Sequence, residues 1–539
     1  MKKISLISLR LIPICLCLLL AVLSIAYKLI ALELEDGAFL QNEGKKRYIK
    51  YRTINPLRGA IFDRNNIPLA VSIVNYDLYA LRGLNRDKFL KVKDNISLEQ
   101  ITFDGPSFNK KTLLKKNLTP VEQLLIGKLR IDELEIEVRH SRHYPLGEQV
   151  APLIGFYGTD GAQEGLEKSY DSLLSGVQGK QKYYQNARQE IISKPTDIEK
   201  ISSGKDIQLT IDSTIQFYTY KYLVEAIKNN RAKAGVVVVL DNKKGEVLAI
   251  ASYPSYNPNN RNRAIKKNRV LVEAYEFGSV LKPIVFSKAV DLNIINPDDY
   301  MDVPRRFQLG NKLLIDPIDY VRLTGKEIIA YSSQVGASKI ALLLGYENLK
   351  KNYIDFGFSR PISINFPSAS FGFLDAKESI SDRDLAGLGY GYGLEVSPFQ
   401  VAVAYSAFAN KGILKDFKLL MNDETVSRRV ISESAALHTI DALQKVVKIG
   451  TGKKADIKGY KEAGKTGTAH KTKSGSGYAE YLYRASFVGI APIAEESLTI
   501  LVLIEEPGLN AYSGGAIAAP LFKKIAESSL NYLGYIEDE

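Results

Sequence analysis

A serine and a lysine one helical turn apart could act as a nucleophile and its base. Ser279 and Lys282 have this spacing, and Gly278 precedes them and Pro283 follows. A serine at a helix start lies at the positive end of the helix dipole, which favours developing negative charge. Lys282 could accept the hydroxyl proton only when neutral, so its pKa must fall from about 10.4 through burial or nearby cations. The pair predicts acyl transfer through a serine ester, and the alternative is an ordinary helix N-cap.

Two further motifs follow this pair in order along the chain. They are Ser332–Gln334, with the sequence Ser-Ser-Gln, and Lys465–Thr468, with the sequence Lys-Thr-Gly-Thr. The Ser-x-x-Lys spacing alone carries little information, because Ser107–Lys110 and Ser202–Lys205 also fit it. Lys-Thr-Gly-Thr occurs once. In this order, the three motifs resemble the nucleophile, proton-shuttle and carboxylate-binding elements of the penicillin-recognising serine enzymes.

The resemblance implies a role for each side chain in these motifs. It assigns catalysis to four residues: Ser279, Lys282, Ser332 and Lys465. It assigns substrate binding to four more: Gln334, Thr466, Gly467 and Thr468. Ser332 would relay a proton from Lys282 to the leaving amine, and Lys465 would be the second cation. The threonine hydroxyls would hold a terminal carboxylate beside Gly467, which leaves room for the peptide. The backbone N–H groups of Ser279 and Thr468 would form the oxyanion hole.

Segments outside the motifs extend the resemblance to the whole chain. Ala251–Asn259, Gly389–Leu394 and Val396–Gln400 are similar to class B penicillin-binding proteins, and the overall length suits the septal, cell-division (penicillin-binding protein 3) type. This resemblance implies a peptidoglycan D,D-transpeptidase that cross-links stem peptides ending in D-Ala-D-Ala and is trapped by β-lactams. It implies no cofactor. The implied protein partners are a polytopic lipid-II glycosyltransferase and other division proteins.

Two residues depart from the pattern of that family. Phe277 stands where a proline is usual, and Gln334 stands where asparagine is usual. One added methylene would move the side-chain amide by about 1 Å and loosen substrate positioning. One alternative is therefore a catalytically weakened homologue that acts as a structural division scaffold. A third possibility is a D,D-carboxypeptidase or β-lactamase, which differs only in using water as the acceptor.

An apolar run near the N-terminus predicts a membrane anchor. Residues 11–33 are long enough to span a bilayer as a helix, and no small-x-small cleavage site ends the run. Lysines and an arginine precede the run and acidic residues follow it, so residues 1–10 are expected in the cytoplasm and the body outside. With the family resemblance, this predicts a single-pass protein of the inner (cytoplasmic) membrane with its C-terminal body in the periplasm.

Two segments of residues 34–205 indicate a non-catalytic pedestal of the dimerisation type. Arg58–Ala70 has the pattern of a hairpin, and Gly161–Glu167 leads into helical spacing. Both resemble signature segments of the class B pedestal. Neither contains an obvious reactive group, so we expect packing and docking roles. Arg58, Asp63 and Arg64 are expected to form buried charge pairs at a domain junction.

Residues 206–539 are predicted to form the transpeptidase domain. Asp212 or Ser213 can cap a first helix, and a near-continuous valine run, a turn and a returning run predict a buried central hairpin. Two strands and a helix are expected near the end. The segments are 235–241, 246–252, 485–490, 498–504 and 517–533. Strands around a mostly helical middle predict an α+β fold, an antiparallel sheet flanked by helices, as in penicillin-binding proteins and β-lactamases.

Composition favours no other function class. The net charge is +12, but an exported body meets no nucleic acid. The lysine pairs are typical of solvated surface, so we assign the charge no function. The two cysteines, Cys15 and Cys17, both lie in the apolar run, which leaves the body without thiols. His140 and His143 are close in sequence but have no evident third ligand, so no metal site is predicted.

Overall fold

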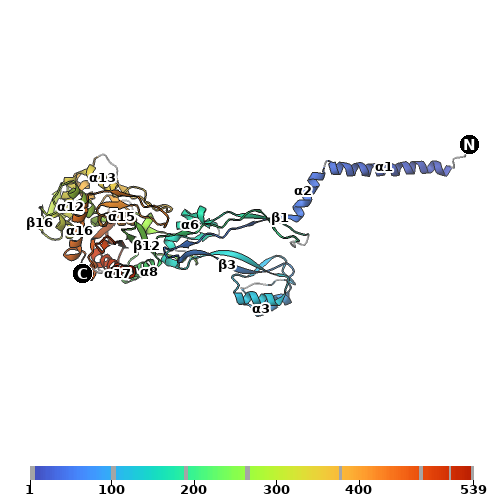
Figure 1. Ribbon diagram of the computed structural model, residues 1–539, viewed down its shortest axis with the longest axis horizontal. Helices are drawn as coiled ribbons and strands as arrows, with labels where there is room; N and C mark the ends of the chain where they lie inside the picture. Colours follow the sequence, from blue (N-terminus) through green and yellow to red (C-terminus); the bar gives the residue numbers. More distant parts are fainter. Residues whose placement is uncertain are drawn as a thin grey trace. The chain divides into compact units, whose positions relative to one another are not determined.

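The computed structural model describes residues 6–34, 36–98, 103, 105–158, 160–186, 192–260, 267–374, 379–472, 478–508 and 511–535 (Figure 1). The chain divides into two compact units. Residues 1–58 and 175–204 form one, and residues 59–174 and 205–539 form the other. The predicted pedestal, residues 34–205, is therefore shared between the two units.

The smaller unit contains the predicted anchor. Helix α1 (Leu6–Leu34) contains a 24-residue stretch from Leu11 with a mean hydropathy of 2.5, which is long and apolar enough to cross a membrane. It is the one such helix in the described part of the chain. Helix α2 (Gly37–Tyr48) follows, and then an antiparallel sheet in the order β1 (Ile49–Ile54), β8 (Gly179–Tyr184) and β9 (Thr196–Glu199).

The pedestal part of the larger unit is built on a sheet of five strands. They are β2 (Ile61–Phe62), β3 (Pro68–Ala80), β4 (Thr112–Lys115), β5 (Leu134–His143) and β10 (Ile207–Gln208). The predicted hairpin is confirmed as β2 and β3, although β3 runs ten residues beyond the expected end. Helices α3 (Arg86–Asn95) and α4 (Pro120–Leu129) enclose a small separate core with β3 and β4.

Short elements complete the pedestal: α5 (Ala151–Ile154), β6 (Tyr157–Gly158), β7 (Gly161–Ala162), α6 (Gly165–Ser169) and α7 (Asp171–Leu174). Glu167 of α6 is fully buried and accepts a 2.7 Å charged hydrogen bond from Arg142 Nε on β5. A buried charge pair of this kind holds segments together because loss of either partner would leave the other charge uncompensated.

The predicted charge pairs at the domain junction are only partly correct. Arg64 forms one, to Glu246 at 3.0 Å. Asp63 is fully buried, but its hydrogen bonds go to backbone N–H groups, those of Asn65, Ile67 and Ser213. A carboxylate that accepts several N–H bonds is satisfied without a cation, and Asp63 therefore fixes a turn and a helix start instead.

The catalytic part is centred on an antiparallel five-stranded sheet. Its order is β12 (Glu246–Tyr253), β11 (Ala234–Asp241), β23 (Leu498–Glu505), β22 (Tyr478–Ala491) and β21 (Ala463–Thr472). The predicted strands are confirmed, but the first hairpin is not central: β12 is an edge strand and β23 is in the middle. The order requires a chain crossover, which the local sequence of the hairpin does not encode.

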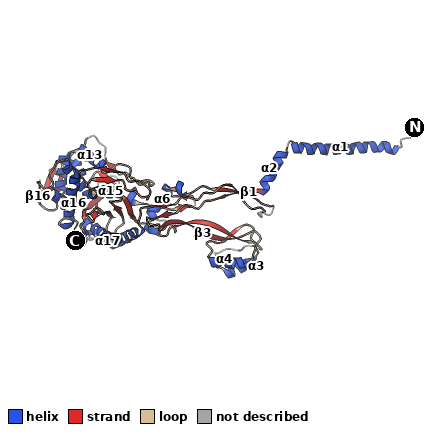
Figure 2. Ribbon diagram, viewed as in Figure 1, coloured by secondary structure: helices blue, strands red, loops and turns tan. Residues whose placement is uncertain are grey.

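Helices cover both faces of this sheet (Figure 2). On one face α8 (Ser213–Asn229) and α17 (Gly514–Leu533) pack on Val237 and Val239, while Val236 and Val238 point into the other core with α15 (Pro398–Ala409) and α16 (Glu433–Lys448). This alternation follows from the two-residue period of a strand. The α+β expectation is correct.

The first catalytic helix begins as predicted but buries a different face. Asp212 caps α8 by accepting from the N–H groups of Thr214 and Ile215. The buried positions include Ile215, Thr219, Leu223 and Ile227. The apolar spacing predicts a buried face of Ile215, Tyr218, Tyr222, Leu223 and Ala226, but Tyr218, Tyr222 and Ala226 are only half-buried. The buried side of α8 also contains Gln216 and Tyr220, so the prediction from spacing is correct for Ile215 and Leu223 alone.

A mostly helical segment comes between the first two and the last three strands of this sheet in the sequence. Its helices are α9 (Arg269–Val272), α10 (Lys282–Asp291), α11 (Gly325–Ala330), α12 (Gln334–Leu344), α13 (Tyr346–Asp355) and α14 (Asp382–Gly389). Small two-stranded sheets decorate it: β13 (Tyr300–Val303) with β16 (Val321–Thr324), β14 (Arg306–Leu309) with β15 (Lys312–Ile315), β17 (Phe373–Leu374) with β18 (Leu394–Glu395), and β19 (Ile413–Lys415) with β20 (Ser427–Arg429).

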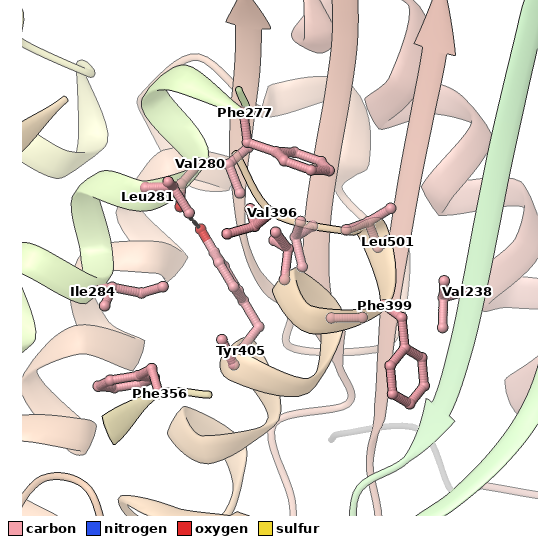
Figure 3. Close-up of a cluster of buried hydrophobic side chains, with 14 of the residues drawn as sticks. Val238, Phe277, Val280, Leu281, Ile284, Phe356, Val396, Phe399, Tyr405 and Leu501 are labelled. Carbon is pink, nitrogen blue, oxygen red and sulfur yellow. Dashed lines mark hydrogen bonds between the residues drawn. The ribbon is translucent and has the colours of Figure 1, made fainter. Parts of the chain in front are cut away.

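The 3₁₀ turn η2 (Gly278–Leu281) is held from below by the core (Figure 3). Phe277, Val280 and Leu281 are buried. The hydroxyl of the fully buried Tyr405 donates a 2.6 Å hydrogen bond to the Val280 carbonyl, which the dashed line marks. Phe277 thus fills a core position with its ring.

We predict that Tyr405→Phe lowers the free energy of unfolding by about 1 kcal/mol, because one buried hydrogen bond is lost without a change in volume. Urea denaturation of the body without its anchor measures this. Tyr353→Phe is the matched comparison, because it also removes one buried hydrogen bond without a change in volume. Tyr353 is fully buried and its hydroxyl donates to the Leu388 carbonyl at 2.7 Å. A Tyr405→Phe protein as stable as the parent would show that this bond contributes nothing net.

Candidate active site

Ser279 lies on η2 at the floor of a cleft of about 740 Å³. The turn leads directly into α10, whose first residue is Lys282. The predicted helix start is therefore a 3₁₀ turn followed by an α-helix. Ser279 is half-buried and lines the cleft, as Lys282 does. No hydrogen bond joins the two side chains in the described structure, which is common for catalytic groups before a ligand tightens the site.

The Lys282 ammonium is enclosed by oxygen atoms of the Ser-Ser-Gln motif. Its Nζ donates to the Ser332 carbonyl at 2.6 Å, to the Ser333 carbonyl at 3.2 Å and to the Ser332 hydroxyl at 3.3 Å. The side chain is 2% exposed. Burial lowers the pKa of Lys282 to about 7, and the negative charge of Asp316 opposes that fall. Near neutral pH the amine can therefore exchange a proton.

Lys465 approaches the same hydroxyl from β21. Its Nζ donates to Ser332 Oγ at 2.9 Å, and its side chain is fully buried. Burial, together with the charge of Lys282, holds the pKa of Lys465 well below its usual value. Because both lysines donate to Ser332 Oγ, the proton of that hydroxyl is free to point elsewhere. Three motifs that are far apart in sequence thus meet at one oxygen atom.

Ser332 is held in a backbone conformation that a non-glycine residue rarely adopts. Its φ is +59°, in the left-handed region. The backbone N–H groups of Ser332 and Ser333 bond to the carbonyls of Ile329 and Ile328, which closes the end of α11. Strain of this kind persists only where the surroundings over-determine the conformation, and it is concentrated at functional sites.

Asp316 is a site residue that the sequence reasoning missed. It is fully buried at the end of β15 and lines the cleft. One carboxylate oxygen accepts from the Gln334 N–H at 2.7 Å and the Val335 N–H at 3.3 Å, and the other accepts from the Ser333 hydroxyl at 2.5 Å. The carboxylate thus caps α12 and fixes the motif beside Lys282. An acidic residue shortly before a serine motif was the only available signal.

The threonines of the Lys-Thr-Gly-Thr motif differ in availability. Thr468 lines the cleft, and its hydroxyl accepts from the Gly514 N–H at 3.2 Å. Thr466 is 7% exposed, and its hydroxyl pairs with that of Thr451 at 2.6 Å. The two lie on one side of β21, as expected from their spacing. Thr468 is the more accessible of the two hydroxyls.

Gly467 has a structural role in addition to the one expected from the sequence. A Cβ atom at this position would come within 2.3 Å of Ser486 Oγ and 2.6 Å of Val280 Cγ2. These neighbours belong to β22 and η2. Gly467 therefore lets the nucleophile turn lie directly against β21.

Gln334 is the first residue of α12 and lines the cleft. Its backbone N–H is bound by Asp316, whereas its side-chain amide forms no hydrogen bond with another described residue. The amide is thus available to a ligand. The backbone of Gln334 is held by Asp316, so the side chain alone can adjust the position of the amide to compensate for the added methylene.

The remaining walls of the cleft are polar and aromatic. Sequence reasoning did not single them out, apart from the motif segments that contain some of them. They include Glu276, Lys312, Arg383, Tyr390, Tyr392 and His470. Glu276 is buried and accepts from the Gly393 N–H at 2.8 Å, and the His470 ring lies 4.7 Å from that of Tyr483. Among the described residues, no group of three or more His, Cys, Asp or Glu side chains could hold a metal ion.

Comparisons with known proteins agree with this geometry. Residues 235–527 match the family described as penicillin binding protein transpeptidase domain, and residues 53–209 match the penicillin-binding protein dimerisation domain. The chain is 33% identical over 537 residues to a probable peptidoglycan D,D-transpeptidase, PbpC, of Pseudomonas aeruginosa, covering 96% of this chain and 94% of that protein. It is 31% identical to peptidoglycan D,D-transpeptidase FtsI of Escherichia coli, covering 96% and 91%.

Solved structures show the same similarity. Penicillin binding protein 3 of Mycobacterium tuberculosis, complexed with aztreonam, has a TM-score of 0.70 at 25% identity and covers 90% of this chain and 98% of that one. The transpeptidase domain of penicillin-binding protein 3 from Burkholderia pseudomallei has a TM-score of 0.57 at 34% identity and covers 61% and 98%. With Ser279, Lys282 and Ser332 in one cleft and Lys465 bonded to Ser332, the chain belongs to the penicillin-binding protein transpeptidase family, as a class B member of the penicillin-binding protein 3 type.

Proposed function

We propose that this protein is a serine-type peptidoglycan D,D-transpeptidase, anchored in the membrane by α1. The observation that carries the proposal is the shared Ser332 hydroxyl, which receives hydrogen bonds from both Lys282 and Lys465 in the cleft that contains Ser279. Its relatives are named as peptidoglycan D,D-transpeptidases, which supports the same reaction here.

In the first step, neutral Lys282 takes the proton of Ser279 as Oγ attacks the penultimate D-Ala carbonyl. The Ser332 hydroxyl then delivers a proton to the amine of the departing D-Ala and is reprotonated from Lys282, so that no net charge is left on the enzyme. The backbone N–H groups of Ser279 and Thr468 are the proposed donors to the oxyanion. An amine of a neighbouring stem peptide attacks the resulting ester, and the proton path runs in reverse.

The donor peptide is proposed to lie along β21. This strand is the last in its sheet, so its outer edge can pair with an extended chain. A terminal carboxylate beside Thr468 would also approach Lys465, and the added negative charge would raise the depressed pKa of that lysine. Substrate binding would thereby assign the positive charge to Lys465 and leave Lys282 as the base. A β-lactam would imitate the donor and remain on Ser279.

The cellular setting is proposed from α1 and the family. One apolar helix anchors the chain, and the short N-terminus would lie in the cytoplasm with the body in the periplasm. By family analogy, a polytopic lipid-II glycosyltransferase and other division proteins would be the partners, and septal peptidoglycan would be the product. Residues 34–205 are the proposed extent of the non-catalytic pedestal.

Labelling with a fluorescent penicillin tests the proposed chemistry. We expect the parent protein to form a persistent covalent adduct and Ser279→Ala to form none while its unfolding transition is unchanged within about 1 kcal/mol. Labelling retained by Ser279→Ala would place the nucleophile elsewhere. A parent protein that never labels would be a scaffold, and rapid loss of the label would indicate a carboxypeptidase or β-lactamase.

The same variant tests the septal role in cells. Depletion of the protein is expected to give filaments that Ser279→Ala does not rescue, because cross-linking at the septum would be missing. Rounded cells would indicate lateral growth instead. Rescue by Ser279→Ala would show that the cell needs the protein only as a scaffold.

The depressed pKa of Lys282 predicts a pH dependence. Because only the neutral amine can accept the proton, the second-order rate of penicillin acylation should fall about tenfold for each pH unit below 7. Asp316 raises this pKa, so Asp316→Asn should move the acidic limb to lower pH by about one unit while its amide oxygen still accepts from α12. Stopped-flow measurement of the acylation rate from about two pH units below 7 to about two above it gives the acidic limb of the pH–rate profile.

Asp384→Asn is the matched control, because Asp384 also lines the cleft but is bound by Ser381. The acidic limb of the pH–rate profile of Asp384→Asn should lie at the same pH as that of the parent protein. If Asp316→Asn lowers the rate equally at every pH, Asp316 only supports the structure and does not set the charge of Lys282.

Gln334→Asn should raise the acylation rate by up to about tenfold, equivalent to about 1.4 kcal/mol of transition-state binding, if the longer side chain displaces the amide from the ligand. Because the Gln334 amide forms no hydrogen bond with another described residue, removal of the methylene breaks no such bond and the change in acylation rate can be measured directly. Ser338, one turn further along α12, provides the control: Ser338→Ala removes a bond to the Gln334 carbonyl without touching the amide. A slower Gln334→Asn protein would mean that the cleft is adapted to glutamine.

A further inference from the structure

The tip of the β14–β15 hairpin brings another lysine, Lys312, into the cleft that Lys282 lines. Lys312 follows the two-residue turn of Gly310 and Asn311, where Gly310 has a φ of +55°. Its Nζ donates a 2.7 Å hydrogen bond to the hydroxyl of Tyr390, and both residues line the same cleft as Ser279. Lys312 is half-buried and Tyr390 is 3% exposed.

This pair has hydrogen-bond donors to spare. The Tyr390 oxygen accepts from Lys312, and the proton of the Tyr390 hydroxyl has no acceptor among the described residues. The ammonium of Lys312 has further N–H groups, and it forms no ion pair in the described part of the chain. A cation held beside a hydroxyl, with both sets of donors unused, is suited to a carboxylate, which accepts several hydrogen bonds at once.

None of the three described carboxylates that line the cleft pairs with Lys312, and each accepts a hydrogen bond from another group. Glu276 accepts from the Gly393 N–H at 2.8 Å, Asp384 accepts from the Ser381 hydroxyl at 2.8 Å, and Asp316 caps α12. Arg383 adds a further positive charge to the same wall. A ligand can therefore supply the negative charge that complements Lys312.

We propose that Lys312 and Tyr390 form a carboxylate subsite for the donor peptide, upstream of its D-Ala-D-Ala end. The proposal rests on the transpeptidase function given above. A cleft of about 740 Å³ exceeds what two alanine residues fill, and it extends from Ser279 and Thr468 to Lys312. The subsite selects donors with a carboxylate at this distance from the reacting bond.

Benzylpenicillin and carbenicillin are a matched pair of probes, since carbenicillin differs only by a carboxylate on the side chain. The measurement is the ratio of their second-order acylation rates on the full-length protein in detergent. Lys312→Gln should lower the carbenicillin rate about tenfold relative to benzylpenicillin, the loss expected for one charge-assisted contact. Tyr390→Phe should change the ratio in the same direction by about threefold, and Lys312→Arg should keep it.

Lys339→Gln is the control for net charge. Lys339 lies on the neighbouring α12, donates to the Asp302 carbonyl and does not line the cleft, so its removal should leave the ratio unchanged. Benzylpenicillin acylation alone tests the proposed function, and the ratio alone tests the subsite. An unchanged ratio in Lys312→Gln, or an equal fall for both penicillins, would overturn the subsite while leaving the transpeptidase assignment intact.

Discussion

The catalytic part of this protein depends on two lysine amines buried against one serine hydroxyl. Burying a charge is costly, and two like charges near one oxygen atom are more costly still. The cost is reduced by the lowered pKa of both amines, by the carbonyl oxygens around Lys282 and by the nearby carboxylate of Asp316. The same arrangement that destabilises the charged state makes a lysine usable as a base near neutral pH.

Such an arrangement needs rigid supports, and each motif has its own. The nucleophile turn η2 rests on Tyr405 and against Gly467, where no Cβ could fit. Ser332 is locked in a left-handed conformation between the end of α11 and the cap that Asp316 gives to α12. Lys465 is fixed by its place in a five-stranded sheet. A shift of about 1 Å in any of these would separate the three motifs, because proton transfer requires hydrogen-bond distance.

Beyond this rigid centre, the cleft is lined by side chains with unused hydrogen-bonding capacity. Among the described residues, the Gln334 amide, the Lys312 ammonium and the Tyr390 hydroxyl line the cleft without a complete set of partners. The division is physically reasonable. The bond-making groups must be pre-organised in a dry environment, whereas the walls select the substrate through contacts that the ligand itself completes.

The sequence by itself determined the chemistry, the anchor and the α+β class, because motif spacing and apolar periodicity are local properties of the chain. Ser279, Lys282, Ser332 and Lys465 could be named without a structure, but the convergence of Lys282 and Lys465 on the Ser332 hydroxyl is a tertiary fact. The position of β12 at the sheet edge, the role of Gly467 and the participation of Asp316, Lys312 and Tyr405 were decided by packing between segments distant in sequence. Neither crossovers nor long-range hydrogen bonds leave a periodic signal in the residues that form them.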